Sequence, residues 1–224
     1  MNKYLFPIYA VILGFLVVKL TQNKPIKNVK LLLAFSGAFL LSLTIFELLP
    51  QVYNHLDTKL TGLAIMAGIL LQIILEFFSK GAEHGHVHTS KNNSVFPWLL
   101  FISLCLHSFL EGFPIDQHND MVYGVLIHKI PIAVLITTFL FQSNFKTYQI
   151  IFFLGLFAIA TPIGTYISNE TDIVTNYIHY INAMVIGIFL HISTTILFES
   201  SEGHKFNLNK LLAIISAVAI AYFI

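Results

Sequence analysis

Long apolar runs dominate this chain of 224 residues and limit the folds that it can adopt. A helix that crosses a membrane needs roughly 20 mostly apolar residues. Eight runs of about this length are separated by short polar segments, at about 4–22, 29–50, 60–80, 95–115, 119–142, 147–168, 174–199 and 207–224. Only 10% of the residues are charged, against about 25% in a typical soluble domain. The sequence therefore predicts an all-α polytopic membrane protein with eight transmembrane helices in one domain, 1–224.

The kinds of charged and sulfur-containing residue exclude two classes of function. All twelve basic residues are lysines and the formal net charge is +1, so the chain has no basic patch of the kind that nucleic acid requires. The single cysteine, Cys105, excludes an intrachain disulfide framework and a cysteine-rich metal site. We therefore expect a lipid bilayer, and not a nucleic acid, as the partner of the surface.

The lysines predict the orientation of the chain in the membrane. Connections that face the cytoplasm are enriched in lysine and arginine. With eight spans, the first, third, fifth and seventh connections share one side and carry nine lysines: Lys19, Lys24, Lys27, Lys30, Lys80, Lys91, Lys146, Lys205 and Lys210. The other side has only Lys3 and Lys59. Both termini are therefore expected outside, and the histidine-containing loop 81–94 in the cytoplasm.

Two neighbouring runs contain ionisable side chains where a membrane span should be apolar. The fourth run carries His107, Ser108 and Glu111, and the fifth carries His128 and Lys129. Such residues are costly at bilayer depth, so they normally face a partner or a water-filled cavity. His107 and Glu111 are four residues apart and therefore share a helix face, with Ser108 beside them.

The short turn between these two runs sets their relative depth. The runs must be antiparallel because only a tight turn at Asp116–Asn119 joins them. His107 lies nine residues before this turn and His128 nine residues after it, so both are roughly 13 Å below the outer surface. The side chains of His107, Glu111 and His128 can therefore converge near the middle of the bilayer.

Two imidazoles and a carboxylate form a common ligand set for Zn²⁺ that leaves one coordination position for water. Lys129, next to His128, either compensates the carboxylate of Glu111 or fills the place of a second cation. The alternative interpretation is a set of interhelical hydrogen bonds, which polar residues commonly make in membranes. The matched depth of three ligand-type residues favours a metal site.

Other polar residues in the runs are interpreted as groups along an ion pathway. They are Glu47, which precedes Pro50 in the second run, Thr161 within "ATPIG" in the sixth, and His191 and Glu199 in the seventh. Glu47 and Glu199 fit equally well as interfacial residues that reach water. Pro131, in the fifth run, frees the carbonyl of Ile127 beside His128.

The loop "AEHGHVH" carries His84, His86 and His88, which could capture Zn²⁺ weakly on a flexible segment. A short histidine-rich tract is only a compositional hint. An ordinary solvated loop explains the pattern equally well.

Taken together, these motifs resemble the ZIP (Zrt/Irt-like protein) family of divalent metal-ion transporters. "HSFLEG" (107–112) is similar to the signature of the family's fourth helix, "HKIP" (128–131) to that of the fifth and "ATPIG" (160–164) to that of the sixth. "FELLP" (46–50) fits the end of the second helix. Eight spans, outward termini and a histidine-containing third loop are also the family plan.

The resemblance implies that His107, Glu111 and His128 bind the transported ion, with Ser108 alongside. It implies Zn²⁺ as the substrate, with Fe²⁺, Mn²⁺ or Cd²⁺ as further candidates, carried into the cytoplasm across the plasma or inner cell membrane. Where many members have an acidic residue after the fifth-helix histidine, this chain has Lys129. A single-ion site is therefore expected. The family also suggests a homodimer and an alternating-access motion of helices 1, 4, 5 and 6 against the rest.

Two other functions compete with transport. One is an intramembrane zinc-dependent hydrolase, with the metal on His107, His128 and His191 and water activated by Glu111. Depth argues against it, since His191 lies roughly 22 Å from the outer end of its helix, well below the other two histidines. The other is a metal sensor that does not transport, which the sequence does not separate from a carrier.

Overall fold

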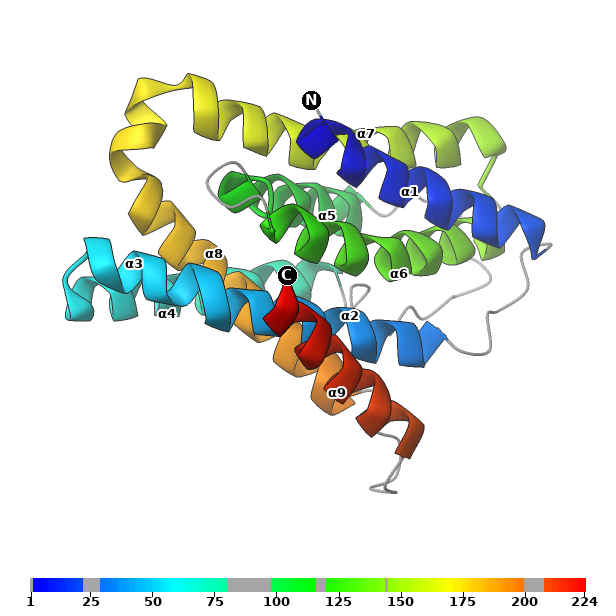
Figure 1. Cartoon of the computed structure of the whole chain (residues 1–224). Helices are drawn as coiled ribbons and strands as arrows, with labels where there is room; N and C mark the ends of the chain where they lie inside the picture. Colours follow the sequence, from blue (N-terminus) through cyan, green and yellow to red (C-terminus); the bar gives the residue numbers. More distant parts are fainter. Residues whose placement is uncertain (1, 22–28, 80–97, 116–119, 144, 200–207) are drawn as a thin grey trace.

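The computed structural model describes residues 2–21, 29–79, 98–115, 120–143, 145–199 and 208–224. All regular secondary structure in these ranges is helical (Figure 1). The α-helices are α1 (Asn2–Leu20), α2 (Val29–Leu43), α3 (Leu49–His55), α4 (Thr58–Ser79), α5 (Trp98–Leu110), α6 (Met121–Gln142), α7 (Thr147–Glu170), α8 (Asp172–Glu199) and α9 (Leu208–Phe223).

Within these described ranges, seven helical segments are long and apolar enough to cross a membrane. They correspond to the first seven apolar runs of the sequence, with α2 and α3 forming one continuous segment, Val29–His55. The eighth run forms α9, a shorter apolar helix of 16 residues. The structure therefore supports a polytopic helical membrane protein with seven clear spans.

The helices pack as two bundles, each with its own apolar core. The site bundle consists of α1, α5, α6 and α7, which share a cluster of buried side chains that includes Val11, Leu104, Ile132 and Phe153. The second bundle consists of α2, α3, α4, α8 and α9, which share a cluster that includes Phe39, Val52, Ile65, Phe189 and Ala217. In Figure 1 the site bundle lies above the second bundle, and α8 runs from the end of α7 down into the second bundle.

Helix α6 contributes to both cores. Its beginning, with Met121, Val122 and Val125, belongs to the cluster of the second bundle. The part that follows, from Ile132 to Leu140, belongs to the cluster of the site bundle. The boundary between the two cores therefore crosses α6 between Val125 and Ile132.

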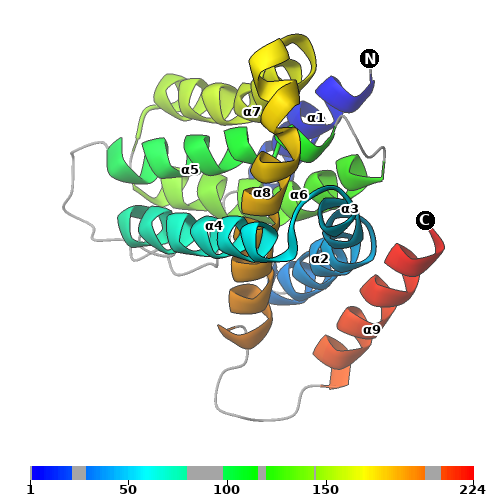
Figure 2. The same ribbon diagram turned by 90° about the vertical axis from the view of Figure 1, so that its left-hand side faces the viewer.

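Glycines allow close helix crossings within each bundle. A Cβ atom on Gly164 of α7 would lie 2.0 Å from the carbonyl oxygen of Phe109 and 3.4 Å from the Cα atom of Gly112. A Cβ atom on Gly187 of α8 would lie 2.0 Å from the carbonyl oxygen of Ile65 and 3.0 Å from the Cα atom of Gly68. Small residues at such crossings let membrane helices approach closely. Figure 2 shows α4 and α8 crossing in the second bundle.

The second apolar run ends later than the sequence predicts. The sequence analysis placed the end of this run at about residue 50, where Pro50 lacks the N–H group that continues the helical hydrogen bonds. Instead, Thr44–Leu48 forms a π-helical turn, with the N–H of Leu49 donating to the carbonyl of Thr44, and α3 then continues through Pro50 to His55. The wider π turn directly before Pro50 accommodates the proline ring, so the prediction of an end at residue 50 was wrong.

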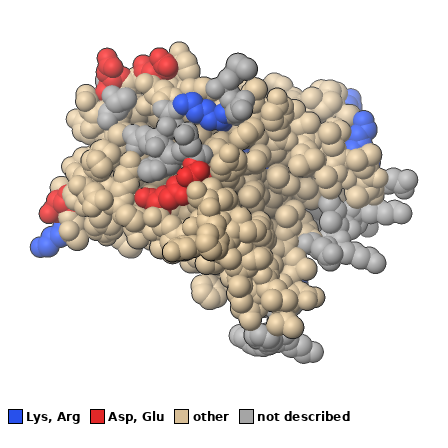
Figure 3. All heavy atoms as spheres, in the orientation of Figure 1, with Lys and Arg blue, Asp and Glu red and all other residues tan. Residues whose placement is uncertain are grey.

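The fourth run is also not a single α-helix. Helix α5 ends at Leu110, and a turn at Glu111 and Gly112 leads into a 3₁₀ segment, Phe113–Ile115. By contrast, α6 remains helical through Pro131. The face drawn in Figure 3 is mostly uncharged, as expected of a protein whose flanks contact lipid tails.

Candidate metal-binding site

The candidate ligands come from the end of α5 and the middle of α6. His107 and Ser108 lie in the last turn of α5, and His128 lies on α6. Glu111 follows α5, but its N–H still donates to the carbonyl of His107 at 3.0 Å, so it keeps the helical position one turn after that histidine. All four side chains are buried. The structure therefore brings together the residues that the sequence analysis singled out.

The spacing of the three side chains is close to that of a metal site, but somewhat wider. The Nε2 atom of His107 lies 3.5 Å from Oε2 of Glu111, and the ring centroids of His107 and His128 are 6.3 Å apart at 80°. Two imidazoles on one tetrahedral Zn²⁺ would have centroids roughly 5 Å apart. Among the residues that the structure describes, no three histidine, cysteine or carboxylate side chains are arranged to hold a metal ion. The rings must approach by about 1 Å to share one ion.

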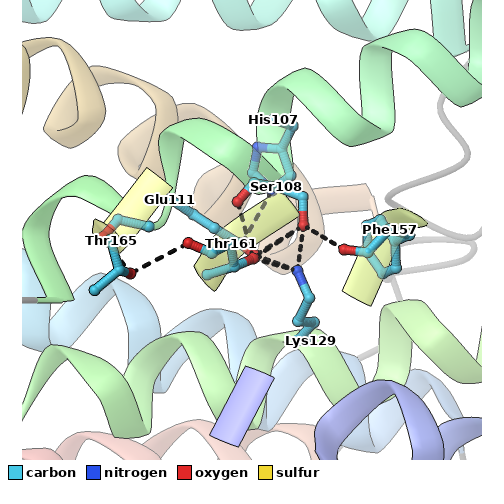
Figure 4. A network of polar contacts seen from close by, with 8 residues as sticks. His107, Ser108, Glu111, Lys129, Phe157, Thr161 and Thr165 are labelled. Carbon is cyan, nitrogen blue, oxygen red and sulfur yellow. Dashed lines mark hydrogen bonds and ion pairs between the residues drawn. The ribbon is translucent and has the colours of Figure 1, made fainter. Parts of the chain in front are cut away.

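Lys129 lies beside this ligand set at the centre of a polar network (Figure 4). Its ammonium group donates to Oε1 of Glu111, to the hydroxyl of Ser108 and, at 2.8 Å, to the hydroxyl of Thr161. The same ammonium lies 4.2 Å from the ring centroid of Phe157, within range of a cation–π interaction. The sequence analysis gave two roles for Lys129, compensation of the charge of Glu111 or occupation of the place of a second cation, and the structure places Lys129 and Glu111 in an ion pair.

Thr161 and Thr165 of α7 hold the end of α5 in place. The hydroxyl of Thr161 lies 2.7 Å from Oε1 of Glu111 and 2.9 Å from the carbonyl of Ser108, and it can donate to either of these acceptors. The hydroxyl of Thr165 donates to the carbonyl of Gly112 at 2.8 Å. Helix α7 therefore supplies a wall of the site through hydroxyl groups.

The two oxygens of Glu111 consequently have different surroundings. Oε1 faces Lys129, Ser108 and Thr161, all of which are able to donate a hydrogen bond to it. Oε2 faces Nε2 of His107. A cation bound by His107 and His128 would therefore be close to Oε2, while Oε1 remains hydrogen-bonded to Lys129, Ser108 and Thr161.

Among the other pathway residues, Glu47 and His191 lie outside this cluster. Glu47 lies half-buried in the π turn after α2, close enough to Asp120 for the two carboxylates to interact electrostatically. Glu199 ends α8, but its side chain is outside the described residues. His84, His86 and His88 also fall outside the described residues.

His191 of α8 pairs with a residue that the sequence analysis missed. Its Nε2 atom lies 2.6 Å from Oε2 of Glu76 on α4, and both side chains are about one-fifth exposed. The sequence did contain an indication of this pair, because Glu76 is an acidic residue inside the third apolar run, where an ionisable side chain normally faces a partner. The pair belongs to the second bundle, whereas His107 and His128 belong to the site bundle.

Comparisons with known proteins agree with the motifs around this site. A family model described as ZIP Zinc transporter matches residues 80–224, which include α5, α6 and α7. Zinc transporter ZIP1 of Danio rerio is 31% identical over 88 residues, and Zinc transporter ZIP1 of Takifugu rubripes is 29% identical over 88 residues. Each alignment covers 37% of this chain, and the chain spans 29% of the length of each of these relatives.

Proposed function

The chain belongs to the ZIP zinc transporter family, and from this we propose that it carries divalent metal ions, Zn²⁺ foremost, across a membrane through the site on α5 and α6. The observation that carries the proposal is the buried group of His107, Glu111 and His128, in which Oε2 of Glu111 faces His107. Imidazole and carboxylate ligands suit Zn²⁺, and they also suit Fe²⁺, Mn²⁺ and Cd²⁺.

We propose a single transported ion at this site, because the ammonium group of Lys129 is paired with Oε1 of Glu111, the oxygen that does not face His107. A second cation beside Oε1 would have to displace a buried ammonium group, and like charges at such close range repel strongly in a low dielectric. Ser108 and Thr161 orient Glu111 and do not need to contact the ion themselves.

The proposed direction is into the cytoplasm, with eight spans, both termini outside and loop 81–94 inside. The distribution of the lysines supports this orientation. The membrane is the plasma membrane or an inner cell membrane, and a homodimer is the proposed assembly. A cysteine introduced into loop 81–94, in a chain whose Cys105 is replaced by Ser, should react only with a reagent that reaches the cytoplasm. Labelling by an impermeant reagent added outside would reverse the orientation.

The two bundles offer a physical basis for alternating access. The site bundle holds every proposed ligand, and the second bundle contacts it mainly through α2 against α6 and α4 against α5. Most of each apolar core lies within one bundle, and α6 is the helix that contributes buried side chains to both, so a movement of one bundle against the other is accommodated along α6. The hydrolase alternative is less well supported, because its third ligand, His191, is paired with Glu76 on the second bundle.

Metal uptake into proteoliposomes tests the transport proposal. We expect His107→Ala, Glu111→Ala and His128→Ala each to abolish most Zn²⁺ uptake while the protein still inserts, because each leaves an incomplete ligand set. His191→Ala is the control, since it removes a membrane histidine outside the ligand set, and it should retain measurable transport. If any two of the three ligand variants take up Zn²⁺ with the parental rate and affinity, the ion does not cross the membrane through this site.

A further inference from the structure

Two histidines from different helices are in direct contact away from the site. His55 ends α3 and His179 lies on α8, and their rings stack with centroids 4.1 Å apart and an interplanar angle of 11°. His55 is exposed and His179 is half-buried. By the proposed orientation, the connection that follows His55 lies on the outer side of the membrane.

From the contact between the two rings we infer that His55 and His179 bind a divalent metal ion on the outer side of the protein. They would form a capture site that the ion reaches before the transport site. This inference rests on the proposed function.

The hydrogen bond of His55 fixes which of its nitrogens is available. Its Nδ1 atom lies 2.9 Å from the carbonyl oxygen of Gln51, one turn earlier on α3. A carbonyl only accepts hydrogen bonds, so Nδ1 carries the proton and, in the neutral ring, Nε2 carries the lone pair. Histidines that ligate metals commonly donate their other ring N–H to a backbone carbonyl in this way, which orients the ring.

The stack places two such rings within reach of one ion. Two imidazoles on one tetrahedral Zn²⁺ have centroids roughly 5 Å apart, so these rings, now 4.1 Å apart, need to separate by about 1 Å to share an ion. Because the lone pairs lie in the ring planes and the planes are nearly parallel, the rings must rotate apart to point at a common ion. His55 has room for this rotation, because its side chain is exposed at the end of α3.

Polar residues connect this histidine pair with the interior of the protein. Gln51 lies one turn before His55 and Glu47 one turn before Gln51, on the continuous helical segment from α2 to α3. Exposure falls along this series, from exposed His55 to half-buried Gln51 and Glu47. Glu47 lies near the carboxylate of Asp120, immediately before α6, the helix that carries His128. The negative charges attract a cation inward from the histidine pair.

The binding test separates this inference from the transport proposal. The background is the full chain with His107→Ala, His128→Ala, His84→Ser, His86→Ser and His88→Ser. It is reconstituted in nanodiscs and titrated with Zn²⁺ alone. We expect this background to bind Zn²⁺, and His55→Phe or His179→Phe to weaken that binding at least about tenfold. Phenylalanine keeps an aromatic ring in the stack and removes the ligand nitrogen, so the fold is preserved. Tyr53→Phe, an exposed aromatic change on the same helix, should leave Zn²⁺ binding unchanged.

Uptake by the otherwise native chain gives the second readout. His55→Phe should raise the KM for Zn²⁺ about tenfold at low concentrations and leave the maximal rate near the parental value, because the ligands of the transport site are intact. The double variant with His179→Phe should be no worse than either single variant, since a two-ligand site is lost with either ring. Unchanged Zn²⁺ binding in the background carrying His55→Phe overturns the capture site, whatever the fate of the transport proposal. The transport proposal fails independently, if the chain with His107→Ala and His128→Ala still takes up Zn²⁺ at the parental rate.

Discussion

Lys129 and Glu111 form an ion pair that is almost completely closed off from solvent, with each residue 1% exposed. The pair joins the middle of α6 to the end of α5. A buried ion pair is weak evidence for stability by itself, since both charges lose their hydration. Here it has a second effect, because it leaves one oxygen of the carboxylate facing His107 and one facing the ammonium group.

The first prediction concerns the stability of this pair. Lys129→Met leaves the carboxylate of Glu111 buried without its counter-charge, so it should destabilise the protein by about 3–5 kcal/mol. The double variant Lys129→Met/Glu111→Gln should be clearly less destabilised than the sum of the two single variants. Reversible unfolding in detergent, analysed as a double-mutant cycle, measures the coupling. Additive effects of the two changes would show that the residues are energetically independent.

The second prediction concerns the number of ions. Lys129→Glu replaces the ammonium group with a second carboxylate that faces Glu111, and a pair of carboxylates attracts a further cation. We expect more Zn²⁺ bound per chain, or a changed order of preference among Zn²⁺, Fe²⁺, Mn²⁺ and Cd²⁺ in uptake. Equilibrium dialysis with radiolabelled metal and competition uptake provide the two measurements. Parental stoichiometry together with parental selectivity would mean that Lys129 does not limit the site to one ion.

The third prediction uses two glycines of α7. Gly164→Ala places a Cβ atom 2.0 Å from the carbonyl oxygen of Phe109, so α7 and the end of α5 must separate. This should destabilise the protein by about 1–3 kcal/mol and reduce uptake, because Thr161 and Thr165 hold the turn that carries Glu111. Gly155→Ala is the matched control: a Cβ atom there meets nothing within 4 Å, so stability should stay equal or rise. Equal melting temperatures for the two variants would contradict the close crossing.

The fourth prediction concerns pH. Metal binding needs neutral imidazoles, whose ordinary pKa is about 6.5, so protons compete with Zn²⁺ for His107 and His128. Uptake at a fixed low Zn²⁺ concentration, with equal pH on both sides of the membrane, should fall as the pH drops through this range. Raising the Zn²⁺ concentration should move the fall to lower pH, which is the signature of competition. If the pH at which uptake is half-maximal does not change with the Zn²⁺ concentration, the titrating group lies outside the ligand set.

Apolar run lengths were sufficient to predict the seven clear spans, because a bilayer imposes a minimum length on each helix. The matched depth of His107 and His128 also follows from counting residues across one short turn, and their rings do lie near each other. The end of the second run could not be predicted in this way. Its continuation past Pro50 depends on a π turn, which changes the hydrogen-bond register locally and has no clear pattern in the sequence.

Contacts between distant runs were the least predictable part of the site. The hydroxyl of Thr161 reaches Glu111 only because α7 packs tightly on α5, and that approach depends on Gly112 and Gly164 meeting across the two helices. The pairs Glu76–His191 and His55–His179 likewise join runs that are far apart in sequence. Spacing along one helix does not indicate which helix will lie opposite.

The position of the site on α6 has a mechanical consequence. His128 and Lys129 lie between Val125, which is anchored in the core of the second bundle, and Ile132, which is anchored in the core of the site bundle. Any displacement between the bundles must therefore bend, twist or detach α6 across this short stretch, where Pro131 has already removed one backbone hydrogen bond. His107 belongs wholly to α5, so the same deformation changes the distance between the two imidazoles. The affinity of the site for the ion therefore depends on the displacement between the site bundle and the second bundle.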